Sequence, residues 1–137
     1  MRPIVAPMRK TFLLLLVLMA IALAACGGGG ATEFTVNAKD SYFEPDTWDA
    51  TAGETLTMTF VNEGFLEHEF TLVKLGDDIG AMSEWDVSKQ LYSTGSVSGQ
   101  TQGQYQFTVD EPGTYQVICT IDNHFDGGMA GTLEVDG

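Results

Sequence analysis

Basic residues, cysteine and histidine are all scarce in this 137-residue sequence. Six lysine and arginine residues stand against 19 aspartate and glutamate residues, which gives a formal net charge of −13. An acidic surface repels phosphate, so this balance excludes a nucleic-acid-binding protein. Two cysteines, Cys26 and Cys119, are too few for a small fold held together by disulfides. Charged residues make up only 18% of the chain and aromatic residues reach 10%, which indicates a folded protein, and the length favours one domain.

The first 25 residues differ sharply from the rest of the chain. Half of the basic residues (Arg2, Arg9 and Lys10) lie here, and 14 of the 15 residues at 11–25 are apolar. The uninterrupted apolar run at 12–25 is shorter than the roughly 20 residues that a membrane-spanning helix needs. It has the length of the apolar segment of a secretion signal. The sequence therefore predicts that residues 1–25 are an export signal.

The apolar run ends in Leu23-Ala24-Ala25-Cys26, and four glycines follow. This ending resembles a bacterial lipoprotein signal, in which an apolar residue and two small residues precede a cysteine. The resemblance implies cleavage before Cys26 and lipidation of Cys26; the alternative is an ordinary signal peptide with an incidental cysteine. Residues 26–32 then form a Gly-rich tether.

Export would remove three of the six basic residues and none of the acidic ones, which leaves a chain of net charge −16. Several acyl chains together anchor a protein stably to a bilayer. We therefore expect the exported chain to be lipid-anchored to the outer face of the cytoplasmic membrane or to lie in the periplasm.

From residue 33 onward the sequence alternates between apolar and polar residues. Leu56, Met58 and Phe60, for example, alternate with threonines. This alternation is typical of strands with one buried and one solvated face. Turn residues separate six or seven such stretches, which predicts one all-β domain at 33–137 with a Greek-key β-sandwich fold. The region 77–91 lacks this period, and we expect one or two helical turns within it.

The rare side chains that bind metals fall into one pattern. Cys119, His124 and Met129 follow one another with four residues between neighbours, and His68 is the only other histidine. Strand parity places Cys119 at the end of one strand and His68 at the start of another, both facing inward. If those strands are antiparallel neighbours, all four residues meet at one end of the sandwich. Two imidazoles, a thiolate and a weak thioether form the ligand set of an electron-transfer copper site.

Two other interpretations of these residues remain open. Zinc would need a fourth ligand such as Glu69, and it would leave the position of Met129 unexplained. Cys119 and His124 could instead be a nucleophile and its base. An inward-facing cysteine at a strand end is poorly exposed, however, so we expect no enzymatic activity.

Motifs along the whole body of the chain share the order found in one known family. They are Phe43-Glu44-Pro45, Gly53-Glu54-Thr55-Leu56, Asn62, His68, Pro112-Gly113-Thr114-Tyr115 and Met129-Ala130-Gly131-Thr132-Leu133. With these motifs the chain resembles a cupredoxin, the blue copper family of plastocyanin, azurin and auracyanin. The spacing of Cys119, His124 and Met129 is most similar to the auracyanin-like branch. The resemblance implies a cupredoxin-like sandwich and one mononuclear copper ion held by His68, Cys119, His124 and Met129.

Two positions depart from the family pattern. Asp122 and Asn123 precede the second histidine, where the family usually has Pro-Gly. Glu69 follows the first histidine, where the family usually has an asparagine whose side chain ties the two ligand-bearing loops together.

These observations predict a membrane-anchored, monomeric blue copper protein that shuttles single electrons outside the cytoplasmic membrane. Its partner would be a redox protein, such as a c-type cytochrome, or a membrane redox complex. The alternative is a periplasmic copper-binding or copper-tolerance protein that sequesters copper, because acidic residues flank both histidines. We expect the partner to dock on a small apolar patch with an acidic rim around His124. The patch residues are Phe65, Leu66, Phe125, Gly127, Gly128 and Ala130, and the rim residues are Glu67, Glu69, Asp122 and Asp126.

Overall fold

The computed structural model describes residues 31–137. The predicted export signal at 1–25, the lipidation of Cys26 and residues 26–30 of the predicted tether lie outside these described residues. Within residues 31–137, no helix has the length and apolar character needed to cross a membrane.

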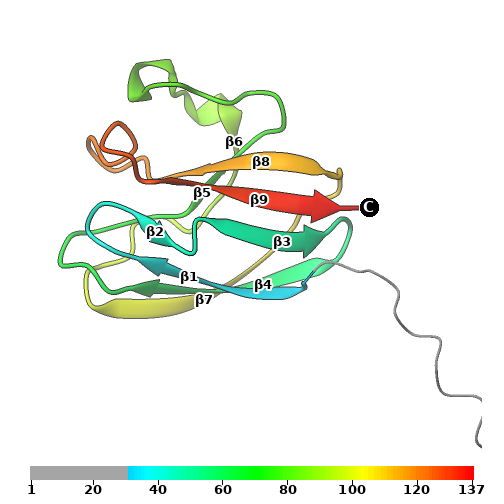
Figure 1. Cartoon of the computed structure of the whole chain (residues 1–137), viewed down its shortest axis with the longest axis horizontal. Helices are drawn as coiled ribbons and strands as arrows, with labels where there is room; N and C mark the ends of the chain where they lie inside the picture. The colour runs from blue at the N-terminus through cyan, green and yellow to red at the C-terminus, as the bar shows by residue number, and fades with distance from the viewer. Residues whose placement is uncertain (1–30) are drawn as a thin grey trace, which may run out of the picture.

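Two sheets face each other as a sandwich (Figure 1). The first has the strand order β2-β1-β4-β7 and the second has the order β3-β9-β8-β5-β6. Both sheets are mixed, since β1 is parallel to β4 and β3 is parallel to β9. The predicted all-β Greek-key sandwich is confirmed. The strand bounds are β1 (Glu33–Ala38), β2 (Phe43–Glu44), β3 (Thr47–Thr51), β4 (Thr55–Asn62), β5 (Thr71–Val73), β6 (Gln90–Ser93), β7 (Thr101–Thr108), β8 (Gly113–Ile118) and β9 (Ala130–Asp136).

The core lies between the sheets, and strand β4 shows how the sequence builds it. Leu56, Met58 and Phe60 are fully buried, while the alternating threonines face outward. Trp48 of β3 packs against the ring of Phe70 with centroids 5.7 Å apart, and its Nε1 donates a hydrogen bond of 3.0 Å to a backbone carbonyl. Burial of such side chains stabilises the fold by about 1.5–3 kcal/mol each.

The described residues contain nine strands, more than the six or seven expected. The additional strands are short: β2 has two residues, β6 has four and β3 has five. Strand β5 also differs from the expected alternation, because all three of its residues are buried. Leu72 belongs to the core between the sheets, and Val73 packs with Ile79 of the chain between β5 and β6.

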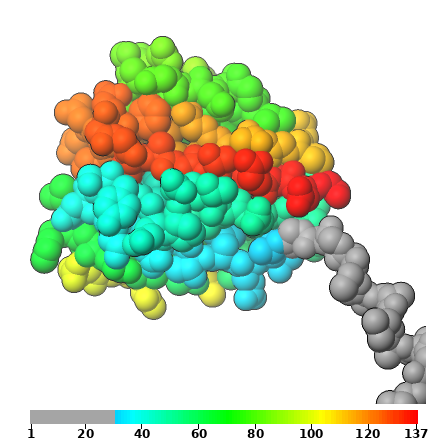
Figure 2. Space-filling view, viewed as in Figure 1, coloured from blue at the N-terminus to red at the C-terminus, as the bar shows by residue number. Residues whose placement is uncertain are grey.

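The connection between β5 and β6, residues 74–89, is called here the strap. It contains two 3-10 helices, η1 (Met82–Glu84) and η2 (Val87–Lys89), which confirms the helical turns expected in this region. The strap covers a second, smaller apolar cluster on the outer side of β5 and β8. In the space-filling view the strap, in green, lies against the loop that follows β8, in orange (Figure 2). The cluster contains Val73, Ile79 and Ile118, with Met82, Trp85 and Phe125 packed against it.

Candidate metal centre

The topology brings His68 and Cys119 to the same end of the sandwich. Cys119 directly follows β8, and His68 lies three residues before β5. These two strands are antiparallel neighbours, as expected, with Thr71 opposite Ile118. His68 is fixed further by two backbone hydrogen bonds with Val97, of 3.1 and 2.8 Å.

His124 completes a compact group of three donor side chains. The ligand atoms of His68, Cys119 and His124 all lie within 4.8 Å of one another. Cys119 Sγ is 3.4 Å from Nδ1 of His124 and 4.0 Å from Nδ1 of His68. His68 and Cys119 are fully buried, whereas His124 is partly exposed. Two imidazole nitrogens and one sulfur thus converge on one point below the surface.

The loop between β8 and β9, residues 119–129, is called here the ligand loop, and it is tightly hydrogen-bonded. Met129 N–H donates to the carbonyl of His124 at 2.9 Å, and Cys119 N–H donates to the carbonyl of Met129 at 3.3 Å. Asp122 adopts a left-handed backbone with φ of 46°, which aspartate tolerates better than most residues. Met129 is fully buried. The loop therefore brings the backbone of Met129 against that of Cys119 and His124, and the role of its sulfur as an axial ligand stays a prediction.

Burial sets the protonation of the two buried ligands. Burial raises the pKa of the Cys119 thiol, and backbone hydrogen bonds involving Glu69 and Ile121 partly oppose that rise. Burial also lowers the pKa of His68, and the neighbouring His124 lowers it further. The imidazole of His68 is therefore neutral near pH 7, with a lone pair available for a metal. Because burial disfavours the thiolate form of Cys119, a bound metal cation would stabilise that form.

The donor set fits copper. A thiolate and a thioether are soft ligands that suit Cu(I), and imidazole suits both Cu(I) and Cu(II). Zinc would require a fourth ligand, and the carboxylate suggested for that role, Glu69, is not part of the donor cluster. Its Oε1 instead accepts hydrogen bonds from Thr71 Oγ1 at 3.0 Å and from Thr120.

Glu69 acts as a tie between the two segments that carry the ligands. It directly follows His68, and its Oε1 accepts hydrogen bonds from both the backbone N–H, at 3.3 Å, and the hydroxyl of Thr120, which directly follows Cys119. The departure from asparagine noted in the sequence thus preserves a link between the loops. The link now depends on a carboxylate rather than an amide.

Sequence reasoning did not assign a role to the side chains that hold the loop leading to His68. Asn62 is buried and donates to the carbonyls of Leu66, at 2.9 Å, and Val97, at 2.8 Å. Asp40 accepts a hydrogen bond of 2.6 Å from the N–H of Phe65. Asn62 was identified from the sequence as part of the family motifs, but without a role. Asp40 gives no sequence signal, because its position beside this loop depends on how β1 and β4 pair.

The residues expected to form a docking patch separate into two groups. Phe65 and Leu66 project into solvent with 82% and 52% of their surface exposed. Phe125 instead packs against the cluster under the strap, and Asp126 Oδ1 accepts a hydrogen bond of 2.8 Å from the N–H of Met82. Glu67 and Asp122 are exposed, whereas Glu69 is only partly exposed and tied to Thr120.

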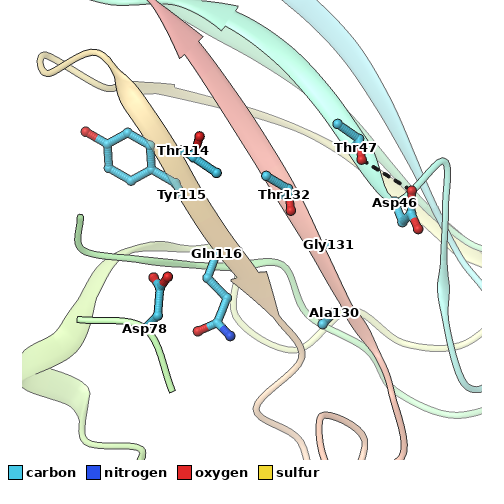
Figure 3. A pocket seen from close by; sticks show the side chains of 9 residues that line it. All are labelled: Asp46, Thr47, Asp78, Thr114, Tyr115, Gln116, Ala130, Gly131 and Thr132. Carbon is cyan, nitrogen blue, oxygen red and sulfur yellow. Dashed lines mark hydrogen bonds between the residues drawn. The ribbon is translucent and has the colours of Figure 1, made fainter. Parts of the chain in front are cut away.

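A separate hollow lies on the outer face of the second sheet (Figure 3). It has a volume of about 400 Å³ and is lined mostly by residues of β8 and β9, together with Asp46, Thr47 and Asp78. The amide of Gln116, which lines it, exchanges two hydrogen bonds of 2.9 Å with the backbone of Ile79. None of the four predicted ligands lines this hollow, so it is not part of the metal centre.

One family model and several known proteins match this sequence. A family model described as a cupredoxin-like domain matches residues 11–133. Auracyanin-A of Chloroflexus aurantiacus is 26% identical over 148 residues, which cover 86% of this chain and 91% of the relative. The copper-resistant cuproprotein CopI of Rubrivivax gelatinosus is 26% identical over 97 residues, covering 68% of this chain and 59% of CopI.

A solved structure extends the agreement to the fold. Reduced auracyanin from Roseiflexus castenholzii superposes with a TM-score of 0.69 at 24% identity, over 80% of this chain and 100% of that one. The family match over most of the sequence, the sandwich and the buried donor cluster lead to one conclusion. This chain belongs to the cupredoxin-like domain family of blue copper proteins, and its cofactor is a single copper ion.

Proposed function

We propose that this chain is a blue copper electron-transfer protein, lipid-anchored at Cys26 and shuttling single electrons outside the cytoplasmic membrane. One observation carries the electron-transfer part of this proposal. The ligand atoms of His68, Cys119 and His124 lie within 4.8 Å of one another at one end of the sandwich, where His68 and Cys119 are buried. The anchor and the location rest on the sequence of residues 1–26 alone.

Four residues would hold the ion in this proposal. His68 and His124 would contribute their Nδ1 atoms, Cys119 would contribute Sγ, and Met129 would contribute a weak thioether donor. Bound copper supplies one-electron redox chemistry at this position. The buried positions of His68 and Cys119 exclude water from the site.

The surroundings of the ligands favour fast electron transfer because they resist movement. The Glu69–Thr120 tie joins the two ligand-bearing segments, and Asn62 fastens the loop before His68. A frame that holds its ligands in place keeps the site nearly unchanged when the charge on the metal changes. Only His124 of the clustered ligands is partly exposed, so a partner approaches the centre most closely there.

The partner in this proposal is a cationic redox protein, such as a c-type cytochrome, or a membrane redox complex. The exposed side chains of Phe65 and Leu66 supply an apolar contact, and Glu67 and Asp122 supply negative charge beside it. Complementary charge steers such encounters and raises the association rate. The chain acts as a monomer in this scheme.

Catalysis is not part of the proposal. Cys119 is fully buried, so its sulfur is not accessible to a substrate as a nucleophile.

The visible absorption spectrum of the copper-loaded, oxidised chain tests the function. We expect an intense band from thiolate-to-copper charge transfer, and rapid reduction by a c-type cytochrome in stopped-flow mixing. Cys119→Ser is the control, because a hydroxyl cannot supply this transition. An unchanged band in Cys119→Ser would show that the ligand assignment is wrong, and a band without electron exchange would remove the carrier function.

Copper sequestration is the second candidate. The similarity to CopI, described as a copper-resistant cuproprotein, favours it. Of the two acidic residues beside His68, Glu69 no longer supports this function because it is hydrogen-bonded to Thr120 and Thr71, whereas Glu67 is exposed. A sequestering protein would protect cells against added copper and exchange electrons slowly, so growth in copper and the self-exchange rate separate the two functions.

A further inference from the structure

One atom of the metal centre has no hydrogen-bond partner. His68 is fully buried and directs Nδ1 toward Cys119, while its Nε2 is buried without a hydrogen bond to any of the described residues. A buried polar nitrogen left unpaired costs about 1–3 kcal/mol. The missing partner of Nε2, the ring nitrogen that faces away from Cys119, therefore requires a physical explanation.

A carboxylate lies beside that nitrogen. Asp40 Oδ1 is 3.9 Å from His68 Nε2. Asp40 belongs to the connection between β1 and β2, so it reaches the site from a different part of the fold. Its Oδ1 is held in place by the N–H groups of Phe65, at 2.6 Å, and Leu66, at 3.4 Å.

The residue between the two groups is a glycine, and its size matters. A Cβ atom added at Gly64 would overlap Asp40 Oδ1 and lie 3.0 Å from His68 Nε2. Any side chain at position 64 would therefore push the carboxylate and the imidazole apart. The loop is built so that these two groups can approach each other.

The separation of 3.9 Å is about 1 Å longer than a direct N–H···O hydrogen bond. A water bridging the two atoms through bonds of about 2.8 Å would need an angle of about 90° at its oxygen, narrower than the tetrahedral angle that water prefers. A side-chain rotation that moves either atom by about 1 Å closes the distance to that of an N–H···O bond.

We propose that Asp40 is a positioning residue for His68, accepting the Nε2–H and thereby keeping Nδ1 unprotonated and aimed at the metal. A neutral imidazole carries its proton on one nitrogen only, so an acceptor at Nε2 selects the tautomer that can bind copper through Nδ1. Outer partners of this kind orient the histidine ligands of metal sites. The proposal rests on His68 being a copper ligand, as the proposed function requires.

The test measures the tautomer of His68 without copper, so that its outcome is independent of electron transfer. Long-range ¹H–¹⁵N correlation spectra of the copper-free chain, taken at about pH 8 where imidazole is neutral, distinguish the two tautomers. We expect the Nε2–H form in the wild type and a mixture of both forms in Asp40→Ala and in Gly64→Ala. The Cu(I) dissociation constant of both variants should rise by about 10–100-fold.

Two further variants complete the design. Asp40→Asn retains an oxygen that can accept from both Phe65 N–H and His68 Nε2–H, so we expect it to restore the Nε2–H tautomer. Asp49→Ala removes an exposed carboxylate from β3 and is the matched control, expected to leave the tautomer and the dissociation constant unchanged.

A different set of results would contradict the proposal. If Asp40→Ala keeps the Nε2–H tautomer and the wild-type Cu(I) affinity and loses only thermal stability, Asp40 merely caps the turn at Phe65. Should Asp40→Ala not fold, Gly64→Ala decides, because its added methyl group separates the same two side chains while the carboxylate remains. An unchanged tautomer in Gly64→Ala overturns the proposal. If the variants change the tautomer but the wild type does not bind copper, the proposed copper function is wrong and the role of Asp40 in setting the tautomer is supported.

Discussion

Burial divides the roles of the two histidines. His68 is fully buried, and the loop before it is held by Asn62 and Asp40. His124 lies on the ligand loop and is partly exposed. One histidine is therefore part of the fixed frame of the sandwich, and the other is where the centre comes nearest to the surface.

The low pKa of His68 predicts a pH dependence of stability. Burial lowers this pKa in the folded chain, whereas the unfolded chain keeps a value of about 6.5. As pH falls below that value, the unfolded chain binds a proton that the folded chain does not, so the free energy of unfolding falls. Urea denaturation of copper-free wild type and His68→Gln at about pH 7.5 and 5.5 measures this contribution. The wild type should lose more stability than the variant; equal losses would contradict the prediction.

Met129 offers a prediction about the reduction potential. Its sulfur is a weak donor that favours Cu(II), so Met129→Leu should retain copper and raise the potential. The exchange nearly conserves volume in a fully buried position and should cost less than about 1.5 kcal/mol of stability. Protein-film voltammetry gives the potential directly. A lowered potential, or complete loss of copper, would show that Met129 is not a weak axial ligand.

At the scale of elements, the strap and the ligand loop form one unit. Phe125 of the loop packs against the same apolar cluster as Met82 and Trp85 of the strap, and Asp126 accepts the N–H of Met82. The strap therefore supports the loop that carries His124 from the outside of the second sheet. Figure 1 shows the two segments close together at the same end of the molecule.

This contact predicts that Trp85→Ala loosens the ligand loop. The indole is partly buried, and we expect its loss to cost about 1–3 kcal/mol of stability. Amide hydrogen exchange at 122–128 should become faster because the cluster that Phe125 packs against loses one of its members. Val87→Ala, at a strap side chain with 72% of its surface exposed, is the control. Exchange that stays as slow as in the wild type would mean that the loop does not depend on the strap.

The same elements show what the sequence could predict. Strand β4 was predictable because one of its faces is buried and the other faces solvent, so buried residues alternate strictly with more exposed ones along it. Strand β5 breaks this rule because the strap covers Val73, while Thr71 is buried and hydrogen-bonds to Glu69 and Ser93. The short strand β3 is paired in parallel with β9, a distant segment, and such pairing leaves no turn signal nearby in the sequence.

The donor cluster was predictable for a different reason. Histidine and cysteine are so rare here that their spacing, together with that of Met129, indicated one site, and the structure brings the donor atoms of His68, Cys119 and His124 together. The residues around them were not predictable in the same way. Asp40 and Glu69 belong to a chain with 19 acidic residues, and only the three-dimensional fold shows which of these carboxylates lie against the ligand segments.

At the scale of the whole molecule, negative charge is almost uncompensated. Residues 31–137 hold all 19 acidic residues and only three lysines. Lys74 and Lys89 donate hydrogen bonds to backbone carbonyls of Ser88 and Asp77, at 2.6 and 3.3 Å, in the region of the strap. Lys39 forms an ion pair with Glu63. No lysine is left on either loop that carries a histidine ligand, so the metal-binding end presents mainly carboxylates beside Phe65 and Leu66.

This charge distribution predicts that electron transfer with a basic cytochrome slows as salt is added. The attraction acts over a screening length that falls to about 8 Å at physiological ionic strength, so salt weakens the encounter before contact. Glu67→Gln combined with Asp122→Asn should lower the stopped-flow rate at low salt and flatten its salt dependence, because both side chains are exposed on the ligand-bearing loops. The exposed Asp49, changed to Asn, is a control away from these loops. Self-exchange between two copies should respond in the opposite sense, since removing like charges at the shared face lets the copies approach. A cytochrome rate that is flat across salt and unchanged in the double variant would leave apolar contact at Phe65 and Leu66 as the basis of docking.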